Sequence, residues 1–390
     1  MLCLVCTALF NVSNNAFRTS GFTYLRISRQ IFESALISYP YPWRTAPRFP
    51  GGEAFIIAAV GQGKVILWGG LQRQDDGRFL GLPNDVVYCF NLDAHSFSDG
   101  EVSGSWEVIK ATGDIHPGRF YAVSVVCNEI VYIFGGRIGD SVFTDALSTL
   151  SRAGRFERLS PTGDVPSPRD GHRGWSYRDE IFILGGLVQR VDEARKSNFV
   201  EIKKIPGTYY NNDCYRYKPK SNEFSRVLTT GDGPTPRIGF GVALLDDCVY
   251  TYGGHCNGIW LNDLHVLKLN SEKLEWTRIA SDGLTGFSMG LCYHTLSAIS
   301  DTQIMMVGGD GKAGAFGNDK IMNKVWIYDA KKCRWKEDEP LPAEFGAGLL
   351  MHQAVEIPKE NGVFVLCIGG YVDTGRTKHP EHLVLYDFRC

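Results

Sequence analysis

A Gly-Gly doublet closes a short apolar run six times along the chain, and this repeat constrains the fold more than any other feature. The doublets end at Gly70, Gly136, Gly186, Gly254, Gly309 and Gly370, so the spacings are 66, 50, 68, 55 and 61 residues. Another apolar run precedes each doublet, and further strand-like runs follow it after a variable loop. Four short strands per unit at periods of about 50 residues are typical of β-propeller blades.

A second repeat sets the phase of these units. The motif Thr-Gly-Asp begins at Thr112, Thr162 and Thr230, and an arginine stands seven residues after each threonine, at Arg119, Arg169 and Arg237. The motif predicts a turn because glycine tolerates positive φ, and a proline before each arginine fixes φ where the chain enters the next inner strand. We interpret these segments as connections between blades.

The two repeats together predict an all-β, six-bladed propeller over residues 41–390, after an N-terminal extension over 1–40 that is poorly ordered or loosely packed. We expect the doublets where a side chain would meet the next blade, or where only glycine fits the backbone. The chain ends after the third strand of unit six, and an unpaired edge is a liability. A strand near Trp43 is therefore expected to complete blade six and close the ring.

Charge and cysteine content argue against several classes of protein. The 41 basic and 43 acidic side chains nearly balance, which argues against a nucleic-acid-binding face. No apolar run approaches the roughly 20 residues of a membrane helix. Most of the 11 cysteines lie in strand-like runs, as in reduced cytoplasmic or nuclear proteins. The start MLCLVCTALF lacks a basic n-region and a clear cleavage site, so secretion is not expected.

One face of the predicted disc gathers the candidate binding residues. In a four-stranded antiparallel blade, the fourth-to-first and second-to-third connections emerge on the same side. This places the three repeat arginines on one face with the residues that directly follow doublets. The longest insertion, 188–211, projects there too, and loops on a rigid scaffold often carry recognition.

The expected ligand contacts fall into a basic group and an apolar group. The arginines, with nearby histidines, would suit a carboxylate or an acidic peptide, unless each arginine pairs with aspartates of its own loop. The aromatic and apolar residues would wall a pocket, unless they belong to ordinary blade packing. The expected contacts are Arg119, Arg137, Arg169, His172, Leu187, Tyr210, Arg237, His255, Trp260, Cys292, Tyr293 and Met351.

The doublets, third-strand aromatics and fourth-strand tryptophans resemble the kelch repeat over residues 43–390. The stretches 82–93, 166–186 and 233–279, and the long insertion in unit three, are further similar to small kelch-domain-containing substrate receptors of cullin-RING ubiquitin ligases. Those receptors read degrons at protein C-termini. The resemblance implies a protein or peptide ligand, such as a C-terminal degron, and assembly with elongin and cullin-RING subunits.

The sequence departs from those receptors at the positions that bind the ligand. In their best-understood members, two blade-four arginines and a blade-five serine grip the terminal carboxylate, and a helix after the propeller recruits elongin and cullin. The matching positions here are His255, Trp260 and Cys292, and no such helix is visible before Cys390. Tryptophan and a thiol do not replace a guanidinium fork and a hydroxyl. The resemblance therefore implies altered specificity, for a C-terminal or an internal motif.

Two alternatives stand beside the receptor interpretation. One is a kelch scaffold without a ligase link, and the other is a galactose-oxidase-like or mutarotase-like enzyme, because a fold does not exclude catalysis. The nine histidines are scattered, and the sequence contains no H-x-H, H-E-x-x-H or G-x-S-x-G motif. We therefore expect a protein-binding module that is not an enzyme and takes no metal or cofactor.

Overall fold

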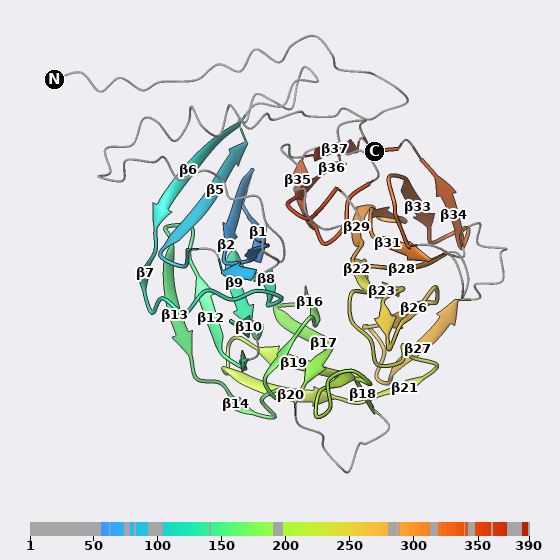
Figure 1. Cartoon of the computed structure of the whole chain (residues 1–390), viewed down its shortest axis with the longest axis horizontal. Helices are drawn as coiled ribbons and strands as arrows, with labels where there is room; N and C mark the ends of the chain where they lie inside the picture. Colours follow the sequence, from blue (N-terminus) through green and yellow to red (C-terminus); the bar gives the residue numbers. More distant parts are fainter. Residues whose placement is uncertain are drawn as a thin grey trace, which may run out of the picture.

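The computed structural model describes residues 56–61, 63–73, 79–81, 83–92, 104–139, 142–189, 198–279, 287, 289–312, 319–338, 340–341, 348–359, 362–372 and 384–388. Its elements are strands, and the sheets stand around a central axis in a propeller-like arrangement (Figure 1). The all-β class and the propeller-like arrangement confirm this part of the expected fold class. Within these ranges no helix has the length and apolarity needed to cross a bilayer.

Successive sheets are built from consecutive segments of the chain. The first contains β1 (Ile56–Val60), β2 (Lys64–Trp68), β5 (Val86–Leu92) and β6 (Gly104–Lys110). The second contains β8 (Val123–Cys127), β9 (Ile130–Phe134), β12 (Leu147–Leu150), β13 (Arg155–Leu159) and β7 (Thr112–Gly113). The third contains β15 (Arg169–Asp170), β16 (Arg173–Tyr177), β17 (Glu180–Val188), β18 (Phe199–Glu201), β19 (Tyr209–Lys218), β20 (Glu223–Val227) and β14 (Thr162–Gly163).

The later sheets repeat this order. One contains β22 (Gly241–Leu245), β23 (Cys248–Tyr252), β26 (Leu264–Lys268), β27 (Leu274–Ile279) and β21 (Thr229–Gly231). The next contains β29 (Thr295–Ser300), β30 (Gln303–Val307), β33 (Val325–Asp329) and β34 (Arg334–Glu337). The last contains β35 (Gln353–Lys359), β36 (Gly362–Ile368) and β37 (Val384–Phe388).

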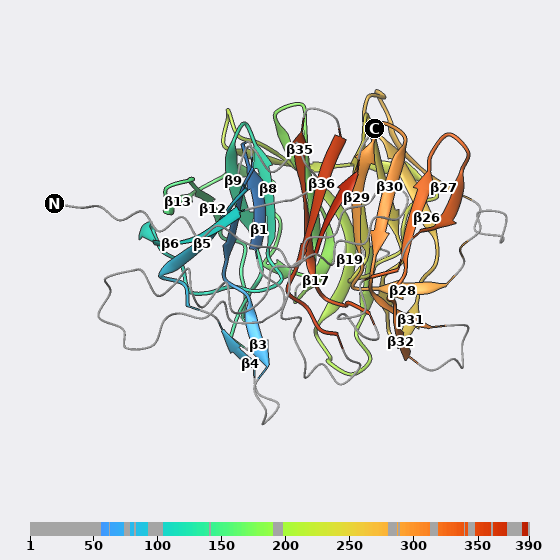
Figure 2. The same cartoon turned by 90° about the horizontal axis from the view of Figure 1, so that it is seen from above.

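Short accessory strands follow several doublets. They are β3 (Leu71–Arg73) with β4 (Phe79–Gly81), β10 (Arg137–Ile138) with β11 (Val142–Phe143), β24 (His255–Cys256) with β25 (Ile259–Trp260), and β28 (Gly290–Cys292) with β31 (Asp310–Lys312) and β32 (Asp319–Ile321). The hairpin β3–β4 and the strands β31 and β32 project from the same side of the disc (Figure 2). We call this side the hairpin face.

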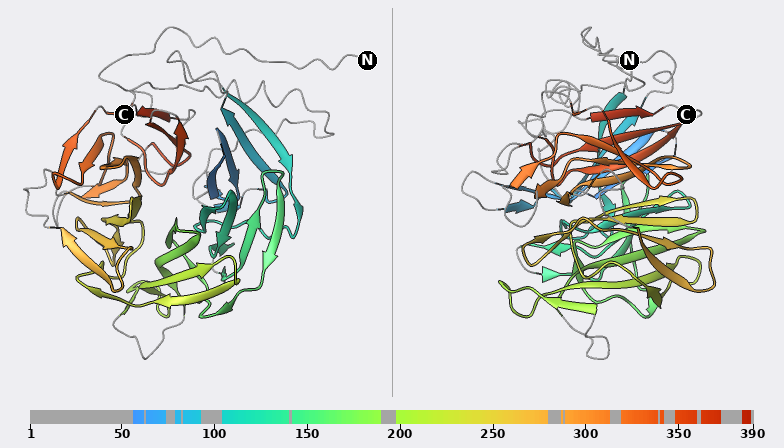
Figure 3. Two further views of the ribbon diagram at one scale, coloured as in Figure 1. Left: turned by 180° about the vertical axis from the view of Figure 1, so that it is seen from behind. Right: turned by 90° about the vertical axis from the view of Figure 1, so that its right-hand side faces the viewer.

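The last sheet lies beside the first (Figure 3). Ile57 and Leu67 of the first sheet share one apolar cluster with Val355 and Phe364 of the last. The last sheet has three strands among the described residues. The proposed closing strand near Trp43 and the boundary between 1–40 and 41–390 lie outside the described residues, so six complete blades and N-terminal closure stay predictions.

The Thr-Gly-Asp segments connect neighbouring sheets, as predicted. Each adds a short parallel strand to the outer edge of the following sheet, and Thr112 and Gly113 pair there with Arg155 and Phe156. The aspartate then caps that outer strand, because a carboxylate oxygen of Asp114 accepts the Arg158 amide at 3.0 Å. The connection therefore ties two blades together before the chain turns inward.

Both reasons expected for the doublets hold in the structure. Gly135 and Gly136 have φ of 67° and 95°, which L-residues rarely adopt. A Cβ on Gly135 would also lie 2.8 Å from the Arg169 carbonyl oxygen of the next blade. The amide of Gly136 donates to that carbonyl at 2.8 Å, so the doublet joins adjacent blades.

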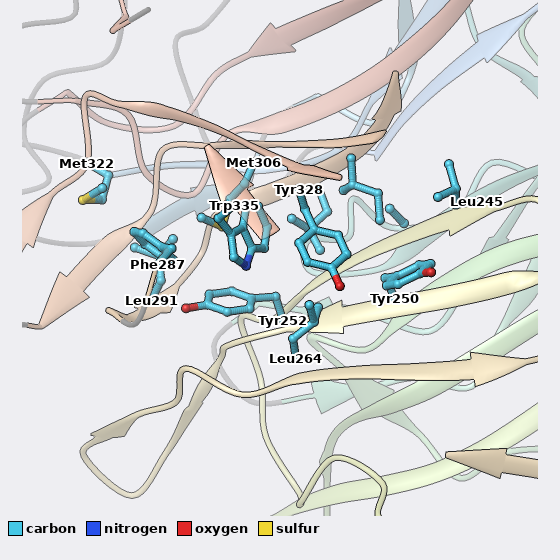
Figure 4. Close-up of a cluster of buried hydrophobic side chains, with 13 residues drawn as sticks. Leu245, Tyr250, Tyr252, Leu264, Phe287, Leu291, Met306, Met322, Tyr328 and Trp335 are labelled. Atoms are coloured by element: carbon cyan, nitrogen blue, oxygen red, sulfur yellow. The ribbon is translucent and has the colours of Figure 1, made fainter. Parts of the chain in front are cut away.

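The core lies between neighbouring sheets. In the cluster of Figure 4, Tyr252 of β23 packs on Trp335 of the next sheet with ring centroids 5.5 Å apart. The fourth-strand aromatics expected to be structural are all buried, namely Trp106, Phe156, Phe224, Trp276 and Trp335. Each large buried side chain of this kind contributes roughly 2–3 kcal/mol through its apolar area.

Candidate functional site

A pocket of about 170 Å³ lies at the hairpin face, around the propeller axis. Four of the expected contacts line it, namely Arg137, Leu187, Tyr293 and Met351. We call it the axial pocket. Sequence reasoning therefore located part of its lining, although the binding role of these residues stays a prediction.

A ring of residues with left-handed backbone conformation, which we call the left-handed ring, shapes the axial pocket. Tyr121, Gly171, Gly239, Tyr293 and Met351 occupy the same position in successive blades, with φ between 54° and 67°. Backbone bonds link neighbours in this ring, for example Tyr293 N to Gly239 O at 2.7 Å and Met351 N to Tyr293 O at 3.1 Å. A side chain in this conformation costs about 1–2 kcal/mol. Two tyrosines and a methionine are thus held at the pocket despite strain, as occurs at binding sites.

Arg137 carries the charge at the mouth of the axial pocket. Its Nε donates to Asp170 Oδ2 at 2.7 Å, and its guanidinium lies 5.3 Å from the ring centroid of Phe120 and 5.6 Å from that of Tyr121. Burial raises the pKa of Asp170 to about 6, while the Arg137 charge opposes this rise. The mouth therefore combines aromatic surface with one ion pair.

The three repeat arginines do not form a surface patch, which corrects the expectation that they contact ligand. Arg119, Arg169 and Arg237 are 1%, 1% and 3% exposed. In each, Nη1 donates to the carbonyl of the first doublet glycine 16 residues later, at 2.9–3.1 Å. The alternative of structural pairing fits better, but the shared partner is the doublet and not an aspartate of the same loop.

Arg237 makes further bonds within its own blade. Arg237 bonds both carboxylate oxygens of Asp263, one of them by Nη2 at 2.8 Å. His265 completes this buried group through Nε2, 2.9 Å from Asp263 Oδ2. Because the guanidinium and the imidazole both bond its oxygens, the pKa of Asp263 is lowered against the opposing effect of burial.

His172 and Cys292 are also buried, which corrects their expected place on the ligand-binding surface. Each is 1% exposed. His172 Nε2 lies 3.2 Å from the Phe134 carbonyl oxygen of the preceding blade, and burial lowers the pKa of this histidine well below its ordinary value. Cys292 lies in β28, paired with Asp310 of β31.

Three further expected contacts gather beside the insertion of the third sheet. His255 pairs with Trp260 across β24 and β25, and their rings lie 5.0 Å apart. Tyr210 of β19 lies 6.2 Å from the His255 ring, and its hydroxyl accepts the Asn257 amide at 3.3 Å. This cluster fixes the insertion against the β24–β25 hairpin, so Tyr210 is buried. These residues do not line the axial pocket.

Sequence reasoning missed eight of the twelve residues that line the axial pocket, and four of these eight are non-glycine residues that closely follow a repeat arginine. Tyr121, Asp170, Arg173 and Ile238 all line it. Their position in the repeat could have identified them, because each stands one to four residues after a repeat arginine. Tyr293 and Met351 occupy corresponding positions in their own units. No group of histidine, cysteine, aspartate or glutamate within the described ranges has the arrangement of a metal site.

Comparison with known proteins gives consistent matches along the chain. The family model of the KLHDC2/KLHL20/DRC7 Kelch-repeats domain matches residues 43–201 and 204–365. The chain is 25% identical over 293 residues to Kelch domain-containing protein 2 of Bos taurus, covering 71% of this chain and 67% of the relative. It is 26% identical over 343 residues to Kelch domain-containing protein 1 of Mus musculus, covering 82% and 76%.

Proposed function

The chain belongs to the KLHDC2/KLHL20/DRC7 kelch-repeat family, and from this we propose that it binds a protein or peptide in its axial pocket as a substrate receptor of a cullin-RING ubiquitin ligase. Membership confirms the kelch resemblance seen in the sequence. The observation that carries the binding proposal is the left-handed ring, in which Tyr121, Tyr293 and Met351 keep bulky side chains at the pocket. A purely structural ring would be less strained with glycine, as at Gly171 and Gly239.

The chemistry of the axial pocket favours a peptide over a reacting substrate. Its walls combine Leu187, Ile238 and Met351 with aromatic faces, and Arg137 is engaged by Asp170. Polar groups set beside such apolar walls give orientation and specificity to a bound ligand. We therefore propose a binding module without catalytic activity, in the cytoplasm or the nucleus.

The ligase link rests on the resemblance of three sequence stretches to the known receptors. The rival is a kelch scaffold that binds partners without a ligase. The two are separated by affinity purification of the tagged full-length chain from cells, with and without proteasome and neddylation inhibitors. Recovery of elongin, cullin and RING subunits, with clients that accumulate under inhibition, supports the receptor. Stable partners without these subunits favour the scaffold.

The face assignment has its own test. Leu187→Ala with Tyr293→Ala removes two walls of the axial pocket, so recovery of clients should fall at least about tenfold, as for central contacts. Ile130→Ala with Leu228→Ala is the matched control, because both side chains are exposed and neither lines the pocket. Equal recovery with both double variants, each shown to be folded by thermal unfolding, would place the binding surface elsewhere.

We also propose that the ring has six blades and that residues 41–46 supply the fourth strand of the last one. The first and last sheets already share an apolar cluster, so they need only this strand to complete the pattern. Trp43→Ala tests it, since loss of a buried fourth-strand tryptophan typically costs about 3–5 kcal/mol. An unchanged free energy of unfolding in urea would reject the closure.

A further inference from the structure

Arg173 stands apart from the other arginines near the axis. It is the first residue of the inner strand β16, and it lines both the axial pocket and a neighbouring cavity of about 140 Å³ between the inner strands. The equivalent residues of four other blades are Val123, Gly241, Thr295 and Gln353. Arg173 is therefore the one charged side chain at these five positions.

The guanidinium of Arg173 has little of the pairing that the buried repeat arginines have. Its Nε donates to the Phe240 carbonyl oxygen of the next blade at 2.8 Å, and this is its only hydrogen bond within the described part of the chain. No described carboxylate lies within 4 Å, whereas Arg237 has Asp263 and Arg137 has Asp170. A cation held away from bulk water is costly unless an anion accompanies it.

Among the described residues that line the axial pocket with Arg173, the one carboxylate is that of Asp170, and Arg137 already engages it. Burial, and after it the charge of Arg173, lower the pKa of His294 and of His352 to about 3, so both rings are neutral near pH 7. His352 bonds the Thr295 hydroxyl at 2.8 Å. Gln353 lines the same two cavities as Arg173, and its side-chain amide makes no hydrogen bond to any described residue.

We propose that Arg173, with Gln353 on the same lining, binds a carboxylate of the ligand at the inner end of the axial pocket. Because Nε is engaged by Phe240, the two terminal nitrogens remain, and this planar fork matches the two oxygens of a carboxylate. The group is either the C-terminus of the ligand or an aspartate or glutamate side chain. That the carboxylate belongs to a peptide ligand rests on the proposed function. That Arg173 binds an anion does not.

The anion site is tested first without any peptide. Thermal unfolding of the full-length chain is measured in sodium acetate and in sodium chloride at equal ionic strength. If Arg173 binds carboxylate, acetate raises the midpoint by about 1 °C or more at concentrations above its dissociation constant. Arg173→Gln abolishes this difference, and Arg173→Lys reduces it because the fork is lost.

The exposed Arg152 supplies the matched control, since Arg152→Gln should keep the full acetate effect. Arg173→Gln should also unfold in chloride no earlier than the wild type, because it removes an uncompensated charge. Equal midpoints in the two salts, or an acetate effect that persists in Arg173→Gln, would overturn the proposal. If Arg173→Gln does not fold, Arg173→Lys alone decides, and an undiminished acetate effect in it counts against the site.

The source of the carboxylate is then identified with a peptide selected by the wild-type chain from a random library with free C-termini. Its C-terminal amide and its Asp→Asn or Glu→Gln versions are compared. Neutralising the carboxylate that Arg173 binds should weaken peptide binding to the wild type at least tenfold. The same neutralisation should weaken peptide binding to Arg173→Gln much less. Binding indifferent to every neutralisation contradicts the carboxylate role. Failure to select any peptide, with the acetate effect intact, rejects the proposed function but upholds the anion site.

Discussion

At the scale of single residues, one residue type has two distinct roles around the axis. Arg119, Arg169 and Arg237 each donate to the first doublet glycine of their own blade and hold the doublets in place, whereas Arg137 and Arg173 line the axial pocket. The difference lies in the partners, because a buried guanidinium whose terminal nitrogens are bonded to carbonyls and side chains of its own blade has little capacity left for a ligand.

Arg237→Gln tests the structural role. The change removes the bonds to Gly253 and leaves the buried carboxylate of Asp263 without its cation. Breaking a buried pair from one side typically costs about 3–5 kcal/mol, so the free energy of unfolding in urea should fall by that order. The exposed pair of Arg152 with Glu129 is the control, and Arg152→Gln should cost under about 1 kcal/mol. Similar losses in the two variants would contradict the structural role.

At the scale of elements, the connection between blades is itself a short strand. Thr162 and Gly163 of β14 pair in parallel with Glu223 and Phe224 of the next outer strand. The glycine is needed twice over, since its φ is 79° and a Cβ would lie 2.2 Å from the Phe224 carbonyl oxygen. The repeated motif therefore reports a close approach of two backbones, which explains its constant phase.

Gly163→Ala and Gly207→Ala separate these two requirements. Both glycines have φ of 79°, but a Cβ on Gly207 would meet no atom within 4 Å. Gly207→Ala should cost only the left-handed strain, about 1 kcal/mol. Gly163→Ala should cost at least about 1 kcal/mol more, because the backbone of the next blade must move. Urea unfolding of both variants measures the difference, and equal losses would show that close approach adds nothing.

At the scale of the whole molecule, protonation of buried histidines opposes folding in acid. Burial lowers the pKa of His116 to about 4, of His294 and His352 to about 3, and of His172 well below its ordinary 6.5. The unfolded chain therefore binds protons that the folded chain excludes. This contribution to stability is complete above about pH 6.5 and is lost as the pH falls below it.

Asp170 acts with the opposite sign. Its folded pKa is raised to about 6, so its contribution favours folding below about pH 4 and is lost as the pH rises through about 6. The free energy of unfolding should still fall from pH 6.5 to 5, by up to about 1.4 kcal/mol per pH unit for each histidine. His352→Gln should make this slope shallower and Asp170→Asn should make it steeper. Unchanged slopes in urea titrations of both variants would reject this assignment.

The candidate site was only partly predictable from the sequence. Counting residues from the repeats located Arg137, Leu187, Tyr293 and Met351, because blade phase dictates which positions come to the axis. The same reasoning grouped the repeat arginines with these pocket residues, although they are buried. A residue's position in the repeat predicts the face on which it lies, but not which atoms surround its side chain. Arg173 was not predicted, because it begins an inner strand directly after His172 and belongs to no repeated motif.

The sequence by itself determined the all-β blades, their connections and the glycine positions, because these depend on local strand patterns and on backbone conformations that only certain residues adopt. Only the tertiary structure decided which polar side chains keep hydrogen-bonding groups available for a ligand. Arg119 finds its carbonyl partner 16 residues away and Arg173 finds Phe240 67 residues away, on the next blade. Such partners are set by the closing of sheets around the axis, where Arg237 gains a carboxylate within its blade and Arg173 reaches the pocket without one.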